Sequence, residues 1–576
     1  MPSHLVHVVL LESSGNQAFV FHSNKLREIS GASYLIRRSC TDWALEAASL
    51  AGMTAPAPHL ANFDTMTTAK RAGLLDKATR IEQGAMVEPV VCTSGKAVFL
   101  ATTKDAAEDI VYRVTRRALE DAPGLVLRGA VSAAISLDDT AENAGRLVKG
   151  LFATVEGLRL TLPPAEARFP LQPMVEPCRT TGSPGEHAVD AFGREVVSDA
   201  AMKKRVAAKD AIGRCADDLD MNLVRDMDQL DKALGLKWRG VVHADGNGFG
   251  KVFLGLADYC QKGATARAFF DLFRDLSVSL DLVGVAALKA ASEMLKEVAG
   301  KVGKVEAKGI PLLVNVMGGD DLSVICDGGE AVGFAAAYLQ AFERLVDEPE
   351  IGGRKNAIPF LQHRERDAPD RFGAAAGIAI AKPHHPVHRA YDLAEELTKS
   401  AKSLIKRDFN DPTLAALDFQ VVFGDSTSDL AGLRDGLVLE KDNKIRAHAR
   451  PYVTTGTARM KKFDAAKAAS LAPRHYSMLD EAGKALRRND NAAALPRSQQ
   501  HVLREAVLAG KAVADARLKL MADRYPGARL GTFGKDCETL FFEHNGLQLT
   551  RLLDAMDIVG VEADRDDDAA NREDGA

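Results

Sequence analysis

The order of apolar and amphipathic segments in the middle of the chain restricts its fold more than any other feature. Apolar residues at i, i+3 and i+4 predict helices, and short apolar runs joined by a tight turn predict a hairpin. The segments are 240–244, 264–298, 311–316, 322–326, 330–346, 373–381 and 390–407. The first six follow the order β-α-β-β-α-β, which predicts a ferredoxin-like α+β domain, an antiparallel sheet with helices on one face.

A similar order occurs near the N-terminus, so the sequence predicts two copies of one fold. Its segments are 7–13, which runs into SGNQAF, the hairpin that begins with 86–92, a helix at 106–120 and a strand at 124–136. In this alignment Ser14 stands where the second copy has Asp245, and Lys96-Ala97 stands where it has Asp320-Asp321. The first copy is therefore expected to lack all three carboxylates.

The chain divides into five predicted regions, two of them ferredoxin-like domains and one a helical domain. They are the degenerate first copy (1–162), a polar linker (163–235), the second copy (236–425), a C-terminal helical domain (426–560) and a disordered acidic tail (561–576). We use the terms first copy and second copy for these two domains below.

Composition excludes several other classes of protein. Of the 576 residues, 46% are hydrophobic and 27% charged, and the net charge is −5, which argues against intrinsic disorder and against a wholly basic nucleic-acid-binding surface. No apolar run is long enough to span a membrane, and the first residues do not have the pattern of a signal peptide. Seven scattered cysteines without a CxxC pair fit reduced thiols, so a cytoplasmic protein is expected.

Three aspartates in the second copy carry the chemical signal. Asp245 follows a strand, Asp320 and Asp321 lie at a hairpin, and the predicted sheet brings them to one edge. Clustered carboxylates repel one another unless a cation offsets their charge, and all-oxygen ligands select Mg²⁺ or Mn²⁺. Two such ions activate an attacking hydroxyl and stabilise a leaving pyrophosphate, so the pattern favours nucleotidyl transfer. Taken singly, GGDD and DGNG are also ordinary turn sequences.

The motifs have a family resemblance. HADGNGFGK followed by MGGDDLSVIC resembles the second palm domain of the large polymerase/cyclase subunit of type III CRISPR effector complexes. SGNQAFVFHSNKLREISGASYLI resembles that family's degenerate first palm, and ALDFQVVFG and FFEHNGLQLTRLLDAMDIV resemble its closing strand and C-terminal helical domain. The resemblance implies a GGDD palm that converts ATP into cyclic oligoadenylate with divalent metal.

The resemblance also implies site residues. The metal ligands would be Asp245, Gly246, Asp320 and Asp321, with two ions expected. The nucleotide would be contacted by glycines that let the backbone approach it, by Asn247 and by lysines of a later helix; these are Asn247, Gly248, Gly250, Gly318, Gly319, Lys399 and Lys402.

The chain departs from the family pattern in three ways. It has no His-Asp dipeptide and its first copy starts almost at once, so a shortened form without the HD nuclease domain is expected. Asn247 replaces the second Asp of the family's Asp-Gly-Asp motif. Only Cys178, His187 and Cys215 remain in the linker as zinc ligands, at irregular spacing, so no zinc is expected.

Several other charged groups have two readings. Lys399, Lys402 and Lys406 share one helix face and either reach a triphosphate or form a solvated basic face. The histidines of PHHPVH at 384–388 form either a surface turn or a metal site. A basic group in the first copy either contacts phosphate or is a solvated helix face; it comprises Lys25, Arg27, Arg37 and Arg38.

The leading hypothesis is therefore a nucleotide cyclase of antiviral defence. Its partners would be nucleoside triphosphates and, through the C-terminal helical domain, subunits of an RNA-guided complex, with RNA contact and no membrane. The alternatives are an RNA-binding assembly subunit with little or no catalysis, and a diguanylate cyclase-like enzyme, since GGDEF domains share the palm.

Overall fold

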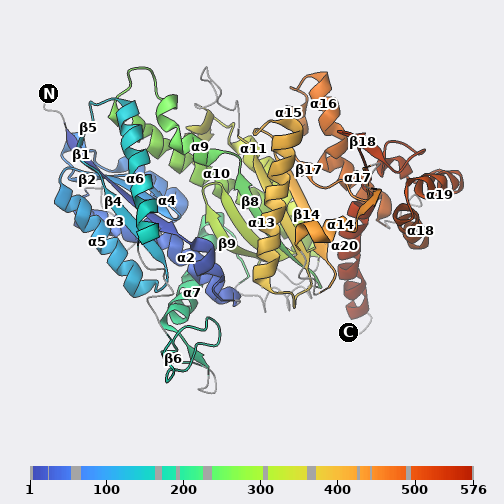
Figure 1. Cartoon of the computed structure of the whole chain (residues 1–576), viewed down its shortest axis with the longest axis horizontal. Helices are drawn as coiled ribbons and strands as arrows, with labels where there is room; N and C mark the ends of the chain where they lie inside the picture. The colour runs from blue at the N-terminus through green and yellow to red at the C-terminus, as the bar shows by residue number, and fades with distance from the viewer. Residues whose placement is uncertain are drawn as a thin grey trace.

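The computed structural model describes residues 4–23, 25–53, 66–161, 171–189, 195–224, 237–301, 309–359, 372–424, 429–440, 444–487 and 495–573. Two sheets, one from each copy, form the left and centre of the molecule in Figure 1, and the C-terminal region lies at the right. The predicted mixture of helix and sheet, built as two related domains followed by helices, is confirmed.

The first copy has a sheet of order β2-β3-β1-β4, with β5 paired to β1. Its strands are β1 (Leu5–Ser14), β2 (Val87–Thr93), β3 (Lys96–Ala101), β4 (Val126–Val131) and β5 (Ile135–Ser136). Its helices are α1 (Asn16–Phe21), α2 (Leu26–Cys40), α3 (Asp42–Leu50), α4 (Thr68–Lys77), η2 (Ile81–Gln83), α5 (Lys104–Asp121) and α6 (Ala141–Thr161). The order 2-3-1-4 is that of a ferredoxin-like domain.

The second copy has a larger sheet of order β17-β14-β13-β8-β10-β9. Its strands are β8 (Arg239–Gly246), β9 (Leu312–Gly318), β10 (Asp321–Asp327), β13 (Ala374–Ala381), β14 (Ala416–Val422) and β17 (Tyr452–Val453), with a separate hairpin of β11 (Glu350–Ile351) and β12 (Arg354–Lys355). Its helices are α9 (Phe249–Leu254), η4 (Leu256–Tyr259), α10 (Ala266–Lys301), α11 (Ala331–Leu345), α13 (Val387–Leu404) and η5 (Ile405–Phe409).

The helices of the second copy cover both faces of its sheet. Val242 and Ile378 belong to the same buried cluster as side chains of α10 and α11. Their neighbours Val241 and Ala379 point the other way and pack against α13. The prediction of helices on one face holds for α10 and α11 only, because α13 crosses the opposite face and connects β13 to β14, which are parallel.

The predicted polar linker contains an ordered helix. A short hairpin, β6 (His187–Ala188) and β7 (Val196–Val197), leads into α7 (Asp199–Leu219), which packs against α2. The two helices cross so closely that a Cβ on Gly31 would lie 1.8 Å from the carbonyl oxygen of Lys204. The linker is thus part of the first copy's packing.

The C-terminal region was predicted to be helical, but it also contains a small sheet. Its helices are α14 (Leu430–Asp435), α15 (Thr457–Met460), α16 (Ala465–Leu471), η6 (Ala472–Arg474), α17 (Tyr476–Leu486), α18 (Arg497–Leu508), α19 (Lys511–Arg524), η7 (Leu530–Thr532) and α20 (Leu552–Glu573). They accompany a four-stranded sheet of β15 (Val438–Glu440), β16 (Ile445–Arg446), β19 (Leu547–Leu549) and β18 (Phe542–His544).

The C-terminal region adds the strand β17 to the second copy's sheet, and buried polar contacts join the segment of this strand to α20. Arg450 pairs with Asp554 at 2.9 Å, and the hydroxyl of Tyr452 donates to the same carboxylate at 2.6 Å. The helix α20 continues to Glu573, so most of the stretch predicted as a disordered acidic tail is helical, and residues 574–576 lie outside the described part. Among the described helices, none is both long enough and apolar enough to cross a bilayer.

Candidate active site between the two copies

The three predicted aspartates lie at one end of the second copy's sheet. Asp245 is the penultimate residue of β8, and β10 starts at Asp321, one position from Leu322, which pairs with Ala244 of β8. The N–H of Gly246 donates to the carbonyl oxygen of Asp320 at 3.2 Å. The pairing of β8 with β10 therefore brings the carboxylates together, as the sequence predicts.

Close packing or a left-handed backbone accounts for four of the five glycines around these aspartates. A Cβ on Gly246 would lie 2.7 Å from the Cβ of Asp320, and a Cβ on Gly318 would lie 2.6 Å from the Cβ of Ser94 in the first copy. Gly319 and Gly248 have positive φ angles, +59° and +84°, which favour glycine. Gly250 meets nothing within 4 Å and lines the cavity described below, so it alone leaves room there.

Asn247 does not point to the predicted nucleotide site. Its side chain is buried, and its Nδ2 donates to the carbonyl oxygen of Leu414 at 2.9 Å, while its backbone N–H donates to Gly373. An aspartate in this orientation would place a carboxylate against a carbonyl oxygen. The predicted contact of Asn247 with nucleotide therefore stays a prediction, and in this structure the side chain anchors the loop that follows β8.

The three lysines of the predicted basic face have different roles. The Lys402 ammonium contacts Asp245 Oδ2 and donates to the carbonyl oxygen of Gly246 at 3.0 Å. Lys399 is 70% exposed and pairs with Glu395 at 3.4 Å, and Lys406 is exposed in η5. Lys402 thus contacts two of the predicted metal-ligand groups, whereas Lys399 lies outside the aspartate cluster.

The aspartates have strongly perturbed acidities. Desolvation, followed by the charges of Asp245 and Asp321, raises the pKa of Asp320 to about 7. Desolvation and the charge of Asp245 likewise raise the pKa of Asp321 to about 7, against the lowering effect of Lys402. Burial is the first cause and the neighbouring carboxylates the second, so the ionised forms of Asp320 and Asp321 are disfavoured unless a positive charge, such as a bound cation, offsets theirs.

The donor set fits a hard divalent ion. Asp245, Asp320, Asp321 and the Gly246 carbonyl offer oxygen atoms alone, which is the preference of Mg²⁺ and Mn²⁺. In the orientations described, the carboxylate oxygens of the three aspartates do not all lie within 4.8 Å of one another. Closing them around an ion requires rotation of these side chains and movement of the Lys402 ammonium from Asp245.

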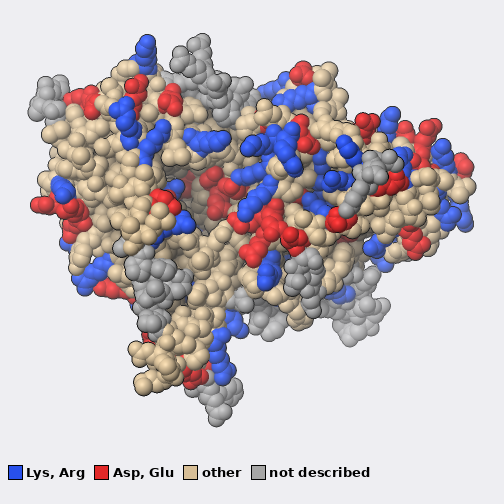
Figure 2. Space-filling view, in the orientation of Figure 1, with Lys and Arg blue, Asp and Glu red and all other residues tan. Residues whose placement is uncertain are grey.

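A cavity of about 740 Å³ separates the two copies in front of the aspartates. Figure 2 shows a hollow between α6 and α13, with acidic side chains gathered around it. The second copy contributes Asp245, Asp320, Asp321, His243, Tyr391 and Glu395 to the wall, and the first copy contributes Asn16, Gln17, Ser94, Lys96 and Phe152. Ligand cavities in proteins are commonly 300–1,000 Å³ in volume.

Two wall residues were missed by the sequence reasoning. Glu395 contacts the Gln17 side chain amide of the first copy, and it lies seven residues before Lys402 on the same helix face, a spacing that could have identified it. His243 is buried with its Nδ1 3.6 Å from Asp321 Oδ1, and desolvation lowers its pKa. Strand alternation offers a weaker signal for His243, two residues before Asp245.

The strand register corrects the alignment of the two copies. Ser13 N–H donates to Gly95 O at 2.9 Å, which matches the bond from Gly246 to Asp320. Glu12 pairs with Lys96 across β1 and β3 and therefore occupies the place of Asp245, while Lys96 occupies that of Asp321. The prediction that Ser14 matches Asp245 is wrong, and the first copy retains one carboxylate, which Lys96 neutralises at 3.3 Å.

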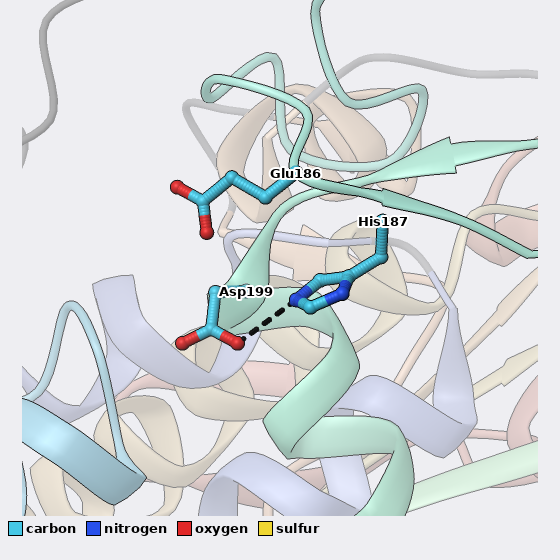
Figure 3. Close-up of side chains that lie close together, drawn as sticks. All are labelled: Glu186, His187 and Asp199. Atoms are coloured by element: carbon cyan, nitrogen blue, oxygen red, sulfur yellow. Dashed lines mark hydrogen bonds and ion pairs between the residues drawn. The ribbon is translucent and has the colours of Figure 1, made fainter.

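The linker residues considered as zinc ligands do not converge. The Cys178 thiol contacts the hydroxyl of Thr180 at 3.3 Å, and His187 pairs with Asp199 at 3.0 Å. Figure 3 shows the His187 ring turned toward Asp199, with the Glu186 side chain alongside. These three offer ligand atoms within 4.8 Å of one another, and in the described residues neither Cys178 and Cys215 nor His384, His385 and His388 join such a group.

The arginines of the basic group in the first copy bond to neighbouring helices. Arg37 bonds to Asp218 of α7 at 2.8 Å, and Arg27 donates to the carbonyl oxygen of Arg205 at 3.2 Å. Arg38 lies 3.6 Å from Asp42. Arg37 is therefore buried against α7, whereas Arg27 is exposed and Arg38 pairs with α3.

No protein-family description and no curated protein matches this chain by sequence. Among solved structures, a Csm1–Csm4 cassette in complex with cA4 is 12% identical with a TM-score of 0.44, and the match covers 91% of this chain and 63% of that one. A cassette in complex with AMPPNP is 13% identical with a TM-score of 0.44, covering 91% and 64%. Csm1 in T. onnurineus is 13% identical with a TM-score of 0.48, covering 96% and 69%. The chain thus spans less than two thirds of the length of the two cassette chains.

Proposed function

We propose that this chain is a metal-dependent nucleotidyltransferase that joins nucleoside triphosphates, and that it converts ATP into cyclic oligoadenylate in a CRISPR-type defence. The observation that carries the proposal is the group of three aspartates, two with raised pKa values, in the wall of a cavity of about 740 Å³ between the two copies. The motif resemblance supplies the choice of ATP and of a cyclic product.

The residues of the second copy would hold the metal. Asp245, Asp320, Asp321 and the carbonyl oxygen of Gly246 are the donors. When bound, a pair of divalent ions lowers the pKa of the attacking 3′-hydroxyl and offsets the charge that develops on the leaving pyrophosphate. The attack on the α-phosphate of a second nucleotide forms the new phosphodiester bond.

The remaining side chains orient the substrates. Lys402 places a positive charge beside Asp245, at the end of the sheet where a triphosphate would meet the aspartates. Lys96 presents a second positive charge from the opposite wall, and Phe152 lies against its ammonium at 5.3 Å from the ring centre. The wall from the second copy therefore carries the three aspartates, and the wall from the first copy carries Lys96 paired with Glu12. Each wall would contact one of the two nucleotides.

The test is turnover of each nucleoside triphosphate by the purified chain with Mg²⁺ or Mn²⁺, with and without RNA, with products identified by mass spectrometry. The double variant Asp320→Ala, Asp321→Ala should abolish product, whereas Asp523→Ala, an exposed residue of α19, should leave it unchanged. A cyclic guanylate would favour the diguanylate cyclase-like alternative. Product that persists in the double variant, or its absence in every condition, would contradict the proposal and favour the assembly subunit.

A further inference from the structure

A buried pair of opposite charges lies behind the GGDD turn, residues 318–321. Oδ1 of Asp281, on α10, accepts the backbone N–H of Gly319 at 2.8 Å. Its Oδ2 accepts a bond from Arg71, on α4 of the first copy, also at 2.8 Å. Asp281 and Arg71 are 5% and 4% exposed. The turn that carries two of the aspartates is thus bonded to the first copy through one carboxylate.

The same helix confines the turn sterically. Gly284 lies three residues after Asp281, on the same face of α10. A Cβ on Gly284 would lie 2.4 Å from the carbonyl oxygen of Gly319, whose φ is +59°. The backbone of Gly319 is therefore held on one side by contact with α10 and at its N–H by Asp281, which leaves its left-handed conformation little freedom.

The contacts continue from Arg71 to the linker helix α7. Thr68, one helical turn before Arg71 on α4, donates its N–H to Asp218 Oδ1 at 2.6 Å, and its hydroxyl accepts a bond from Arg37 at 2.9 Å. Arg37 also bonds to Asp218 Oδ2 at 2.8 Å. In Figure 1, α7 lies below α2, and α4 and α10 lie above them.

The charges explain why Arg71 is needed. An ionised carboxylate makes a stronger acceptor for Gly319 N–H than a neutral amide. Its charge would, however, add to the repulsion among the aspartates on the other side of the turn. Arg71 cancels that charge, and both partners line a small cavity that reaches Asp321. A buried ion pair is weak evidence for stability; here the two bonds of Asp281, to Gly319 N–H and to Arg71, support a positioning role.

We propose that Asp281 and Arg71 are positioning residues of the GGDD turn, with Asp281 fixing Gly319 and Arg71 fixing and neutralising Asp281 from the first copy. The proposal rests on the proposed function, because the aspartates so positioned are the proposed metal ligands. It gives the degenerate first copy a role in the geometry of the second, and it couples the linker helix α7 to the turn through Asp218 and Arg37.

The test uses the full-length variants Asp281→Asn, Asp281→Leu, Arg71→Lys and Arg71→Met. Hydrogen–deuterium exchange of the GGDD turn reports on Gly319 N–H directly, and Mn²⁺ affinity by electron paramagnetic resonance reports on the aspartates. We expect Asp281→Leu and Arg71→Met to speed exchange of the turn at least about tenfold and to lower kcat about 10- to 100-fold at nearly constant KM. Asp281→Asn keeps an oxygen that accepts the Gly319 N–H, and Arg71→Lys keeps the positive charge. Both variants should therefore show smaller changes in exchange and in kcat than Asp281→Leu and Arg71→Met.

The buried pair Glu343–Arg459, at 2.6 Å between α11 and α15, provides the matched control. Glu343→Gln and Arg459→Met should lower the melting temperature about as much as the Asp281 and Arg71 variants do. They should not change hydrogen–deuterium exchange of the GGDD turn. Unchanged exchange and Mn²⁺ affinity in folded Asp281→Leu and Arg71→Met, or equal changes in the control pair, would overturn the proposal. A wild-type chain without turnover would contradict the proposed function alone, since exchange at Gly319 would still test the positioning.

Discussion

Individual side chains near the aspartates differ in how directly they contact them. We expect substitution of a side chain that contacts an aspartate to impair turnover more than substitution of one that does not. Lys402 and Lys399 share one face of α13, yet Lys402 alone contacts Asp245 and Gly246. Position on a helix face therefore identifies both lysines as candidate nucleotide-binding residues. The group that each ammonium contacts in the structure then distinguishes Lys402 from Lys399. The same reasoning separates Glu395, in the cavity wall, from the exposed acids of the helix surface.

Replacement of Lys402 should impair turnover far more than replacement of Lys399. Lys402→Met removes the charge beside Asp245 and should lower kcat/KM for nucleotide at least about tenfold, because a charge-assisted contact at the reacting end of the substrate is lost. Lys399→Met removes an exposed ion pair and should change kcat/KM less than about twofold. Steady-state kinetics of both variants measures this, and equal effects would contradict the assignment.

Lys96 offers a test of the first copy's wall. If Lys96 holds the phosphates of one of the two nucleotides, Lys96→Met should raise KM about three- to tenfold and leave kcat within about twofold. Lys104→Met, an exposed lysine paired with Glu108 on α5, is the matched control and should have no effect. A Lys96 variant whose kcat falls while its KM is unchanged would argue that Lys96 acts on the aspartates instead.

At the scale of elements, the linker helix α7 acts as part of the first copy. Its contact face consists largely of small residues, among them Ala201, Ala207, Ala208 and Ala211, and it lies on α2 at the position of Gly31. A helix whose buried face is alanine has a weak hydrophobic periodicity, so the sequence reads as a polar linker. The close approach of the two backbones replaces large apolar side chains as the basis of this packing.

Substitution of Gly31 should test this crossing. Gly31→Ala places a Cβ 1.8 Å from the Lys204 carbonyl oxygen, and the backbones must separate, so we expect a loss of about 2–4 kcal/mol in the free energy of unfolding. Gly213→Ala lies on the exposed side of α7 with nothing within 4 Å and should stabilise by about 0.5–1 kcal/mol. Urea titration of both variants measures the difference, and a neutral Gly31→Ala would show that α7 does not pack this way.

A buried cluster of charges joins α10 of the second copy to β2 of the first: Glu88 pairs with Arg267 and Arg274. The contact between the two copies should therefore weaken at acidic pH. Burial opposes the charge of Glu88, but the hydrogen bond of Arg267 and the charge of Arg274 outweigh it and lower the pKa of Glu88. A carboxyl with a lowered folded-state pKa stabilises the fold above its unfolded pKa, about 4.3, and this stabilisation is lost as the pH falls through the folded value.

Glu88→Gln should therefore lose most stability at neutral pH. We expect about 3–5 kcal/mol at pH 7, because two buried arginines lose their charged partner. The difference between wild type and variant should shrink as the pH falls below about 4. Unfolding free energies measured from pH 7 down to pH 3 test this, with the exposed Glu120→Gln on α5 as control. A difference that stays constant over this range would contradict the role of Glu88.

How far the sequence predicts this structure depends on whether the determinants are local. The order β-α-β-β-α-β follows from residue periodicity and turn chemistry, which are local, and the fold implied by that order predicts that Asp245 lies near Asp320 and Asp321. The strand register of the first copy depends on the pairing of β1 with β3, and this pairing places Glu12 at the position of Asp245. The sequence alignment instead matched the Gly-Asn dipeptides of the two copies, which do not report the register. Contacts between distant segments, such as Arg71 with Asp281, likewise leave no periodic signal in the sequence.

At the scale of the whole molecule, both walls of the cavity come from one chain. The aspartates belong to the second copy and Lys96 to the first, and buried bonds such as Arg71 to Asp281 hold the copies against each other. Under the proposed function, the two copies of one chain would together enclose the two nucleotides. The two walls differ in charge, since the second copy holds the acids and the first copy holds a neutralised acid pair.

Catalysis should therefore be a property of the single chain. If the cavity is built within one chain, turnover per wild-type chain should stay constant when the enzyme is diluted over about a hundredfold range. An excess of the Asp320→Ala, Asp321→Ala variant should not change it, because the inactive chain offers no wall that the active chain lacks. If the reacting groups instead met between two chains, a tenfold excess of inactive variant would sequester nearly every active chain in a mixed pair and lower turnover severalfold. Product formation in such mixtures distinguishes these two architectures, and inhibition by the variant would contradict a cavity completed within one chain.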